Sequence, residues 1–252
     1  MSVSSSPLRL YVPDDLGVGL TIPLPADQSR YVVQVMRRTV GDPILLFNGR
    51  DGEWQGEVER ADKKATTVAL SKSLRPQTHE PNLWLLFAPA KRTATDLIVQ
   101  KATELGVTAL VPVITTHTNK DRVKAERLTS IAVEAAEQSR RLTIPEIRSP
   151  VHLTGAFTNW PDGYSLYVLD ETGTGAPIAQ VLADFKAQQT GSGAFVMGPE
   201  GGFTETELDL LRALPFSTFV SLGPRILRAE TAALAALTCW QALCGDWCNS
   251  IE

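Results

Sequence analysis

Hydrophobic and polar positions divide the chain of 252 residues into two regions with different periodicities. Up to about residue 77, short runs rich in β-branched and aromatic residues predict strands separated by turns. The expected strands cover residues 9–12, 43–47, 53–59 and 65–70, and one expected helix covers about 25–38. We therefore expect a small β-barrel-like domain over residues 1–77, followed by a proline-containing linker at 72–81.

Beyond the linker, over residues 78–252, short apolar runs alternate with longer stretches of helical character. Nearly continuous apolar strands that alternate with helices predict a parallel sheet covered on both faces, and hence an α/β domain. Thr204 and Glu207 have the spacing of a capping box at the start of the fourth of these helices. The expected strands are 83–88, 109–114, 166–169, 194–197 and 219–222, and the expected helices are near 93–105, 122–140, 177–187, 205–213 and 229–244.

The composition favours a globular protein over a membrane, secreted or metal-binding one. Hydrophobic residues make up 43% and charged residues 21% of the chain, as in ordinary globular proteins. No apolar run approaches the ~20 residues of a membrane span, and the N-terminus lacks the apolar core of a signal peptide. The three cysteines lie near the C-terminus without histidines at zinc spacing. We therefore expect a cytoplasmic protein with no metal site and no membrane association.

The net charge of −4 argues against a nucleic-acid partner. The distribution of the charged residues along the chain weakens this argument. Residues 1–77 carry ten lysines and arginines against nine acidic residues, and basic pairs occur at Arg37-Arg38, Lys91-Arg92 and Arg140-Arg141. Phosphate binding depends on local positive potential rather than on total charge. Such pairs are also common on solvated surfaces, so charge alone leaves RNA binding open.

Two glycine-bearing segments in the second region are the candidates for a ligand site. Gly198-Pro199-Glu200-Gly201-Gly202-Phe203 and Leu222-Gly223-Pro224-Arg225-Ile226-Leu227-Arg228-Ala229-Glu230-Thr231 each follow an expected strand and precede an expected helix. The carboxyl ends of strands are the usual ligand-binding edge of an open α/β sheet. Glycine lets backbone groups approach a ligand closely, because it has no Cβ. Together the two bends predict one wall of a small-molecule site.

The same two segments, in this order and spacing, resemble the C-terminal motifs of the small-subunit (16S) ribosomal RNA uridine N(3)-methyltransferase family, in the SPOUT superfamily. The segments 100–107 and 134–147 resemble that family's first helix and central segment, and 9–12 and 35–37 resemble its PUA-like RNA-binding barrel. The resemblance therefore covers nearly the whole chain. The sequence departs from the family pattern at Arg92-Thr93-Ala94 and Arg140-Arg141-Leu142, both in segments expected to face RNA.

The resemblance implies a sheet domain with a C-terminal trefoil knot, an S-adenosylmethionine site in the knot loops, and a homodimer that completes the site. It implies donor-binding loops at 169–172, 198–202 and 221–228, with adenine near Leu222, Ile226 and Leu227. The expected donor-binding residues are Leu169, Gly198, Pro199, Glu200, Gly201, Gly202, Ser221, Leu222, Gly223, Ile226, Leu227, Arg228 and Thr231.

The implied chemistry requires a group that stabilises negative charge on the uracil and a group that accepts its N3 proton. Arg228 is the candidate for the first role, and Glu200 or Glu230 for the second. Structural interpretations stay open: Glu200 for ordering its loop, and Glu230 for a favourable charge in the first turn of a helix. Arg228 could instead bind a phosphate or hold its loop.

The expected partner is small-subunit ribosomal RNA, either free or in the assembling 30S subunit. The residues expected to contact it are Arg9, Arg37, Arg38, Lys91, Arg141 and Arg225. Two alternatives remain at this point: a SPOUT enzyme with another RNA base or a ribose hydroxyl as its target, and a non-catalytic RNA-binding assembly factor.

Overall fold

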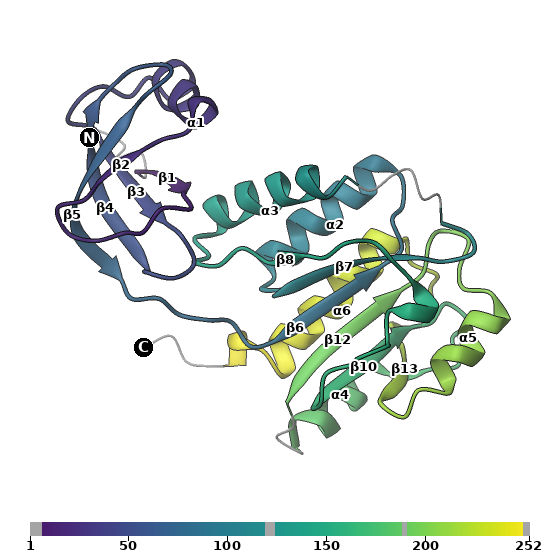
Figure 1. Ribbon diagram of the computed structural model, residues 1–252. Coiled ribbons are helices and arrows are strands. Elements are labelled where there is room, and N and C mark those ends of the chain that lie inside the picture. Colours follow the sequence, from purple (N-terminus) through teal and green to yellow (C-terminus); the bar gives the residue numbers. More distant parts are fainter. Residues whose placement is uncertain (1–6, 119–123, 188–190, 249–252) are drawn as a thin grey trace. The chain divides into compact units, whose positions relative to one another are not determined.

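The computed structural model describes residues 7–118, 124–187 and 191–248, which form two compact units (Figure 1). The first unit comprises the chain up to His79 together with Ala136–Ile144, and the second comprises Glu80–Ala135 and the chain from Pro145 onward. Residues 122 and 123, at the start of one expected helix, lie outside the described ranges. Within those ranges, no helix combines the length and the hydropathy needed to cross a bilayer.

The first unit is built on a curled sheet in the order β1-β3-β4-β5-β2 (Figure 1). β1 and β3 are parallel and the other neighbours are antiparallel. In the described part of the chain β1 and β2 are not hydrogen-bonded to each other, so the sheet is a half-barrel rather than a closed barrel. The five strands are β1 (Leu8–Tyr11), β2 (Thr21–Pro23), β3 (Pro43–Phe47), β4 (Glu53–Arg60) and β5 (Thr67–Arg75).

Two expected elements of this unit have different lengths in the structure. The helix expected over 25–38 is α1 (Ala26–Arg30) followed by a π-helical turn (Tyr31–Val35). It ends because Arg37 adopts a left-handed φ of 52°, which lets the Arg38 N–H reach back to the Val32 carbonyl at 3.0 Å. The linker expected from residue 72 begins later, because β5 continues its pairing with β4 as far as Arg75.

Arg9 holds the sheet of the first unit to the segment Ala136–Ile144. It is only 7% exposed, and its Nε donates to Glu53 Oε1 at 2.5 Å. Its other nitrogens donate to the carbonyls of Ala136, at 2.6 Å, and Arg141. The guanidinium lies 3.7 Å from the centre of the Phe47 ring. One buried cation therefore ties β1 to β4 and to the end of the helix that contains Ala136.

The second unit contains a parallel sheet in the order β11-β13-β10-β12-β6-β7-β8, with β9 paired to β7 (Figure 1). This confirms the parallel α/β domain expected from the alternation of strands and helices. The three short strands β8, β9 and β11 have no counterpart among the expected strands, since each has only two residues. The strands are β6 (Leu83–Phe87), β7 (Ala109–Ile114), β8 (Glu146–Ile147), β9 (Val151–His152), β10 (Tyr164–Leu169), β11 (Ala176–Pro177), β12 (Ser192–Met197) and β13 (Ser217–Ser221).

Helices cover both faces of this sheet, as its two-sided apolar pattern predicts. α6 packs on β12 and contacts both α2 and α4, and its Trp240 lies against Phe195 and Tyr167. On the other face, Leu208 and Leu211 of α5 join a core with Val168 and other strand residues. The expected capping box of α5 is confirmed, with Thr204 and Glu207 satisfying each other's backbone N–H groups. The helices are α2 (Arg92–Glu104), α3 (Ala125–Ser139), α4 (Ile178–Ala187), α5 (Glu205–Arg212) and α6 (Ala229–Leu243).

We predict that Glu53→Gln destabilises the protein by about 3 kcal/mol, because it removes the carboxylate that is ion-paired and hydrogen-bonded to the buried Arg9. Burial alone would raise the pKa of Glu53, but hydrogen bonds from Arg75 and Arg9 outweigh it and hold the pKa below the ordinary value. The stabilisation is therefore complete at neutral pH and is lost as the pH falls through the folded-state pKa. Urea denaturation of both proteins from pH 7 to about pH 2 measures this difference.

The matched control is Asp15→Asn, which removes an exposed carboxylate paired with Arg50. No measurable loss of stability is expected from it, because exposed ion pairs contribute little. Equal stability of Glu53→Gln and Asp15→Asn would contradict the role given to the buried pair.

Candidate functional site

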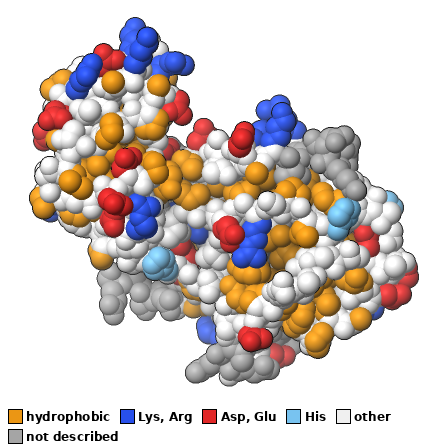
Figure 2. All heavy atoms as spheres, in the orientation of Figure 1, with side chains coloured by type: hydrophobic (Ala, Val, Ile, Leu, Met, Phe, Trp, Pro, Cys, Tyr) orange, Lys and Arg blue, Asp and Glu red, His pale blue; other side chains and the backbone are white. Residues whose placement is uncertain are grey.

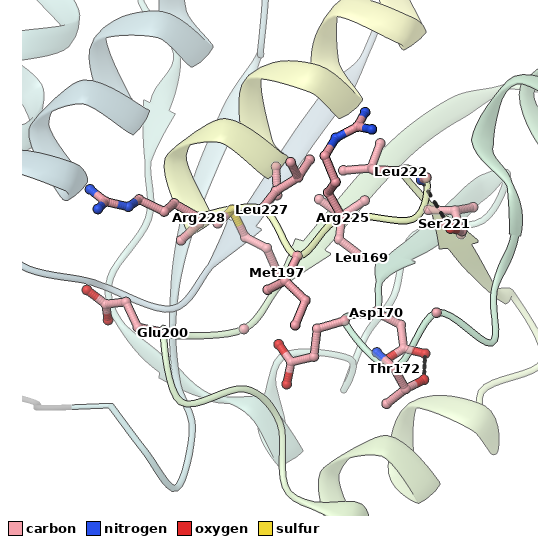
Figure 3. A pocket seen from close by; sticks show the side chains of 18 of the residues that line it. Leu169, Asp170, Thr172, Met197, Glu200, Ser221, Leu222, Arg225, Leu227 and Arg228 are labelled. Atoms are coloured by element: carbon pink, nitrogen blue, oxygen red, sulfur yellow. Dashed lines mark hydrogen bonds between the residues drawn. The ribbon is translucent and has the colours of Figure 1, made fainter.

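The candidate site is a cavity of about 600 Å³ at the carboxyl edge of the parallel sheet (Figure 3). Three neighbouring strands, in the order β13-β10-β12, end at this edge with Ser221, Leu169 and Met197. The loop that follows each strand forms one part of the wall. Segments about 25 to 50 residues apart in sequence thus meet because parallel strands in register finish at the same edge.

Most residues expected to bind a ligand line this cavity. They are Leu169, Gly198, Pro199, Glu200, Ser221, Leu222, Gly223, Ile226, Leu227 and Arg228, and Arg225 lines it as well. Gly201, Gly202, Glu230 and Thr231 are not among its lining residues. Glu230 and Thr231 lie in the first turn of α6, and Thr231 is exposed. The remaining lining residues are Asp170, Glu171, Thr172, Gly173, Met197, Val220, Pro224, Ala229 and Ala232.

The loop after β10 is held in a tight bend by Asp170. Its carboxylate accepts from the Thr172 N–H at 2.9 Å, from the Thr172 hydroxyl, and from the Thr174 hydroxyl at 3.0 Å. Figure 3 shows the bond between the side chains of Asp170 and Thr172 at the edge of the cavity. Asp170 is thus hydrogen-bonded within its own loop, whereas Glu171 lines the cavity without a hydrogen bond to another described residue.

Glu171 lies directly against the glycines of the loop after β12. A Cβ at Gly202, which has a φ of 70°, would lie 1.6 Å from Glu171 Oε1. On the other side of this loop, His117 Nδ1 lies 3.2 Å from the Gly202 carbonyl oxygen. Partial burial raises the pKa of Glu171, the nearby Asp170 carboxylate raises it further, and His117 has the opposite effect. The Glu171 carboxylate can occupy this position only because Gly202 has no side chain.

The loop of His117, which follows β7, is fixed to the same region by Glu207. The Glu207 carboxylate accepts from the Thr116 N–H at 2.8 Å and also completes the capping box with Thr204. These hydrogen bonds outweigh the effect of burial and lower the pKa of Glu207. His117 is thereby held beside Gly201 and Gly202.

The loop after β13 carries the basic residues of the cavity. Gly223 has a φ of 103°, and its N–H donates to the Ser221 hydroxyl at 3.2 Å. Arg228 is the N-cap residue of α6, and Figure 3 shows its side chain and that of Glu200 extending to the same side of the loops. Glu200 is exposed, and its Oε1 lies 3.4 Å from the Lys91 N–H that donates to it. Arg225 extends in a different direction from Arg228 (Figure 3).

The residues expected to contact RNA fall into two groups. Arg37, Lys91 and Arg225 are exposed and Arg38 is half-buried, whereas Arg9 and Arg141 are buried at 7% and 8% exposure. A direct RNA contact by Arg9 would break its bonds to Glu53 and to the carbonyls described above. Figure 2 shows lysine and arginine side chains gathered at one end of the first unit.

The cavity combines apolar side chains with backbone groups at strand ends and with charges of both signs. Such a lining suits a small organic ligand with a flat apolar part and a polar or charged part. Sequence reasoning missed Gly173, Met197, Val220, Ala229 and Ala232 as lining residues, although all except Ala232 adjoin an expected loop. It also did not single out Glu171, whose relation to Gly202 depends on the pairing of β10 with β12.

Comparison with known proteins gives matches over nearly the whole chain. A family model described as an RNA methyltransferase domain matches residues 78–241, and one described as an RNA methyltransferase PUA domain matches residues 24–70. Ribosomal RNA small subunit methyltransferase E of Rickettsia conorii is 33% identical over 96% of this chain and 98% of its own length. The protein of the same name from Bacillus subtilis is 30% identical over 86% of this chain and 88% of its own.

The fold has an equally extensive match among solved structures. The crystal structure of a ribosomal RNA small subunit methyltransferase E from Neisseria gonorrhoeae, bound to S-adenosyl methionine, aligns with a TM-score of 0.85. Its sequence identity is 30%, and the alignment covers 96% of this chain and 99% of the other.

We predict that Gly202→Ala moves the Glu171 carboxylate away from its place, because the new methyl group would occupy the position of Oε1. The positive φ adds strain of about 1–2 kcal/mol. With the carboxylate more fully hydrated, the pKa of Glu171 falls toward the ordinary value. Carboxyl-carbon NMR titration of Glu171 measures this fall, and urea denaturation measures the strain.

Gly173→Ala is the matched control. Gly173 also lines the cavity with a φ of 75°, but a Cβ there would meet nothing within 4 Å. It should carry similar strain and leave the Glu171 titration unchanged. The same Glu171 pKa in all three proteins would show that Gly202 does not define the position of this carboxylate.

Proposed function

Because this chain belongs to the ribosomal RNA small subunit methyltransferase E family, we propose that it transfers a methyl group from S-adenosylmethionine to N3 of a uridine in small-subunit (16S) ribosomal RNA. The observation that carries the proposal is the cavity at the ends of β10, β12 and β13, in a chain that aligns almost completely with a relative bound to this donor.

The residues of the cavity fit S-adenosylmethionine. A volume of about 600 Å³ lies in the range of pockets that enclose ligands of this size. Leu222, Ile226 and Leu227 offer apolar side chains and backbone groups to an adenine ring, and Asp170 places a negative charge on the wall for a cationic ligand. When bound, the donor supplies a methyl group on a positively charged sulfur, so the chain has to supply only alignment and proton transfer.

Arg228 is the residue proposed to stabilise negative charge on the uracil carbonyls. Uracil N3 carries a proton and becomes a good nucleophile only when that proton leaves, which places negative charge on the ring. The Arg228 side chain is exposed at the edge of the cavity and makes no ion pair among those found in the described residues. Its guanidinium is therefore available to a bound RNA base.

The first unit, with the matched PUA model, is the proposed RNA-binding domain, and residues 78–252 are the proposed methyltransferase domain. The exposed residues Arg37, Lys91 and Arg225, with the half-buried Arg38, are the proposed phosphate contacts. For Arg9 and Arg141 we propose an indirect role, because both are buried within the first unit.

We further propose that the chain forms a homodimer, that its donor site lies within a trefoil knot, and that the protein is cytoplasmic. Support for the dimer comes from Ile226, which is 87% exposed beside the cavity, and from the alanine-rich helix α6 that follows it.

Nucleoside mass spectrometry of ribosomal RNA from a deletion strain tests the proposed reaction. Loss of N(3)-methyluridine, restored by the intact gene, is the expected result. Loss of a different methylated nucleoside would support a related enzyme with another target. An unchanged nucleoside profile would favour a non-catalytic assembly factor and would contradict the proposal.

We predict that Arg228→Ala remains folded and loses roughly 100–1,000-fold in methyl-transfer rate, because one donor to the developing anion is removed. Single-turnover methylation of small-subunit RNA or of isolated subunits measures this loss. The control is Arg212→Ala on α5, whose arginine is paired with Glu205 and Asp209 at the surface and should be dispensable for catalysis. Full activity of Arg228→Ala would refute the assignment.

A further inference from the structure

The proposed reaction requires a proton acceptor, and the cavity offers three carboxylates: Asp170, Glu171 and Glu200. We infer that Glu171 is the catalytic base that removes the N3 proton of the target uracil, an assignment that rests on the proposed function. Glu230, the other sequence candidate, lies in the first turn of α6 and is not among the residues that line the cavity.

Hydrogen bonding separates the three carboxylates. Asp170 accepts three hydrogen bonds from Thr172 and Thr174 and serves to close its own loop. Glu200 is exposed, as Glu171 is, but its Oε1 accepts a hydrogen bond of 3.4 Å from the Lys91 backbone N–H. Glu171, by contrast, lines the cavity with its Oε1 packed against Gly202, and it makes no hydrogen bond with another described residue.

The surroundings of Glu171 suit a base that works near neutral pH. A base is most effective when its pKa approaches the working pH, and partial burial together with Asp170 raises the pKa of Glu171 in that direction. The titratable groups that act on it are Asp170, from its own loop, and His117, from the loop after β7. His117 acts in the opposite direction and limits the rise in the pKa of Glu171.

The proton transfer and the methyl transfer require only Glu171, Arg228, the uracil and the donor. The N3–H bond breaks, and its proton passes to a Glu171 carboxylate oxygen. The electron pair left on N3 forms the new bond to the methyl carbon, while the methyl–sulfur bond breaks and its electrons remain on the sulfur. Arg228 stabilises the charge on the uracil carbonyls during the transfer. The proton leaves Glu171 for solvent afterwards, because this residue is exposed at the cavity wall.

Glu171→Gln tests the assignment, because it keeps the size of the side chain and removes only the base. We expect at least a 100-fold loss in single-turnover rate at pH 7. Calorimetric affinity for S-adenosylmethionine should change by less than about 3-fold, since a factor of 3 is below 1 kcal/mol. The wild-type rate should rise with pH through the ionisation of Glu171 and then level off. The variant should lose this rise and recover part of its rate only in alkaline solution, where uracil ionises without help.

Glu205→Gln is the control for charge, because Glu205 is an exposed carboxylate on α5 outside the cavity. It should keep the wild-type rate and pH profile. Glu171→Asp, which retains the carboxylate, should keep a pH-dependent rise at a lower rate, and it serves as the second variant if Glu171→Gln folds poorly.

Three results would overturn the inference. The first is that wild type forms N(3)-methyluridine and Glu171→Gln does so with the same rate and pH profile. This result would contradict the role of Glu171 and leave the proposed function standing. The second is a loss of donor binding that accounts for the whole loss of rate. The third is a wild-type protein that forms no N(3)-methyluridine, which removes the proposed function and this inference with it.

Discussion

The parallel register of β13, β10 and β12 is the constraint on which the site depends. Because the three strands run side by side in the same direction, their loops begin at the same edge of the sheet. Ser221, Leu169 and Met197 are brought together by this register although long helices and loops separate them in the chain. A slip by one residue in either pairing would turn the last side chains of a strand to the other face. The cavity therefore depends on the apolar cores on both faces of the sheet.

Glycines allow the loops at this edge of the sheet to pack closely and to turn sharply. Gly202 allows the Glu171 carboxylate to approach the loop after β12, and Gly223 allows the backbone after β13 to turn with a positive φ. The contacts of Glu207 with Thr116 and Thr204 then hold a fourth segment, with His117, against the same loop. The sheet and these hydrogen bonds therefore fix the positions of the loops whose side chains line the cavity.

Several parts of this arrangement could be predicted from the sequence. Apolar periodicity predicted the parallel sheet and its helices, and the two glycine-bearing segments predicted two of the three loops through their positions after strands. The spacing of Thr204 and Glu207 predicted a capping box that the structure confirms. These features are local, because each depends on residues within a few positions of one another.

Features that depend on distant contacts could not be predicted in the same way. An arginine is usually exposed, so residue type alone predicts a surface position for Arg9. In the structure Arg9 is buried, with hydrogen bonds to Glu53 and to backbone carbonyls more than 120 positions away in the sequence. The half-barrel, the two-residue strands and the early end of the first helix likewise depend on tertiary pairing or on single φ angles. The place of Glu171 beside Gly202 belongs to this group, because no spacing in the chain connects the two residues.

The central claim is that the donor binds among the loops after β10, β12 and β13. Calorimetric titration with S-adenosylmethionine and S-adenosylhomocysteine, combined with hydrogen–deuterium exchange, tests it most directly. The account predicts saturable heat with both compounds and slower exchange in residues 169–173, 197–200 and 220–232. Absence of measurable binding, or protection confined to other segments, would contradict it.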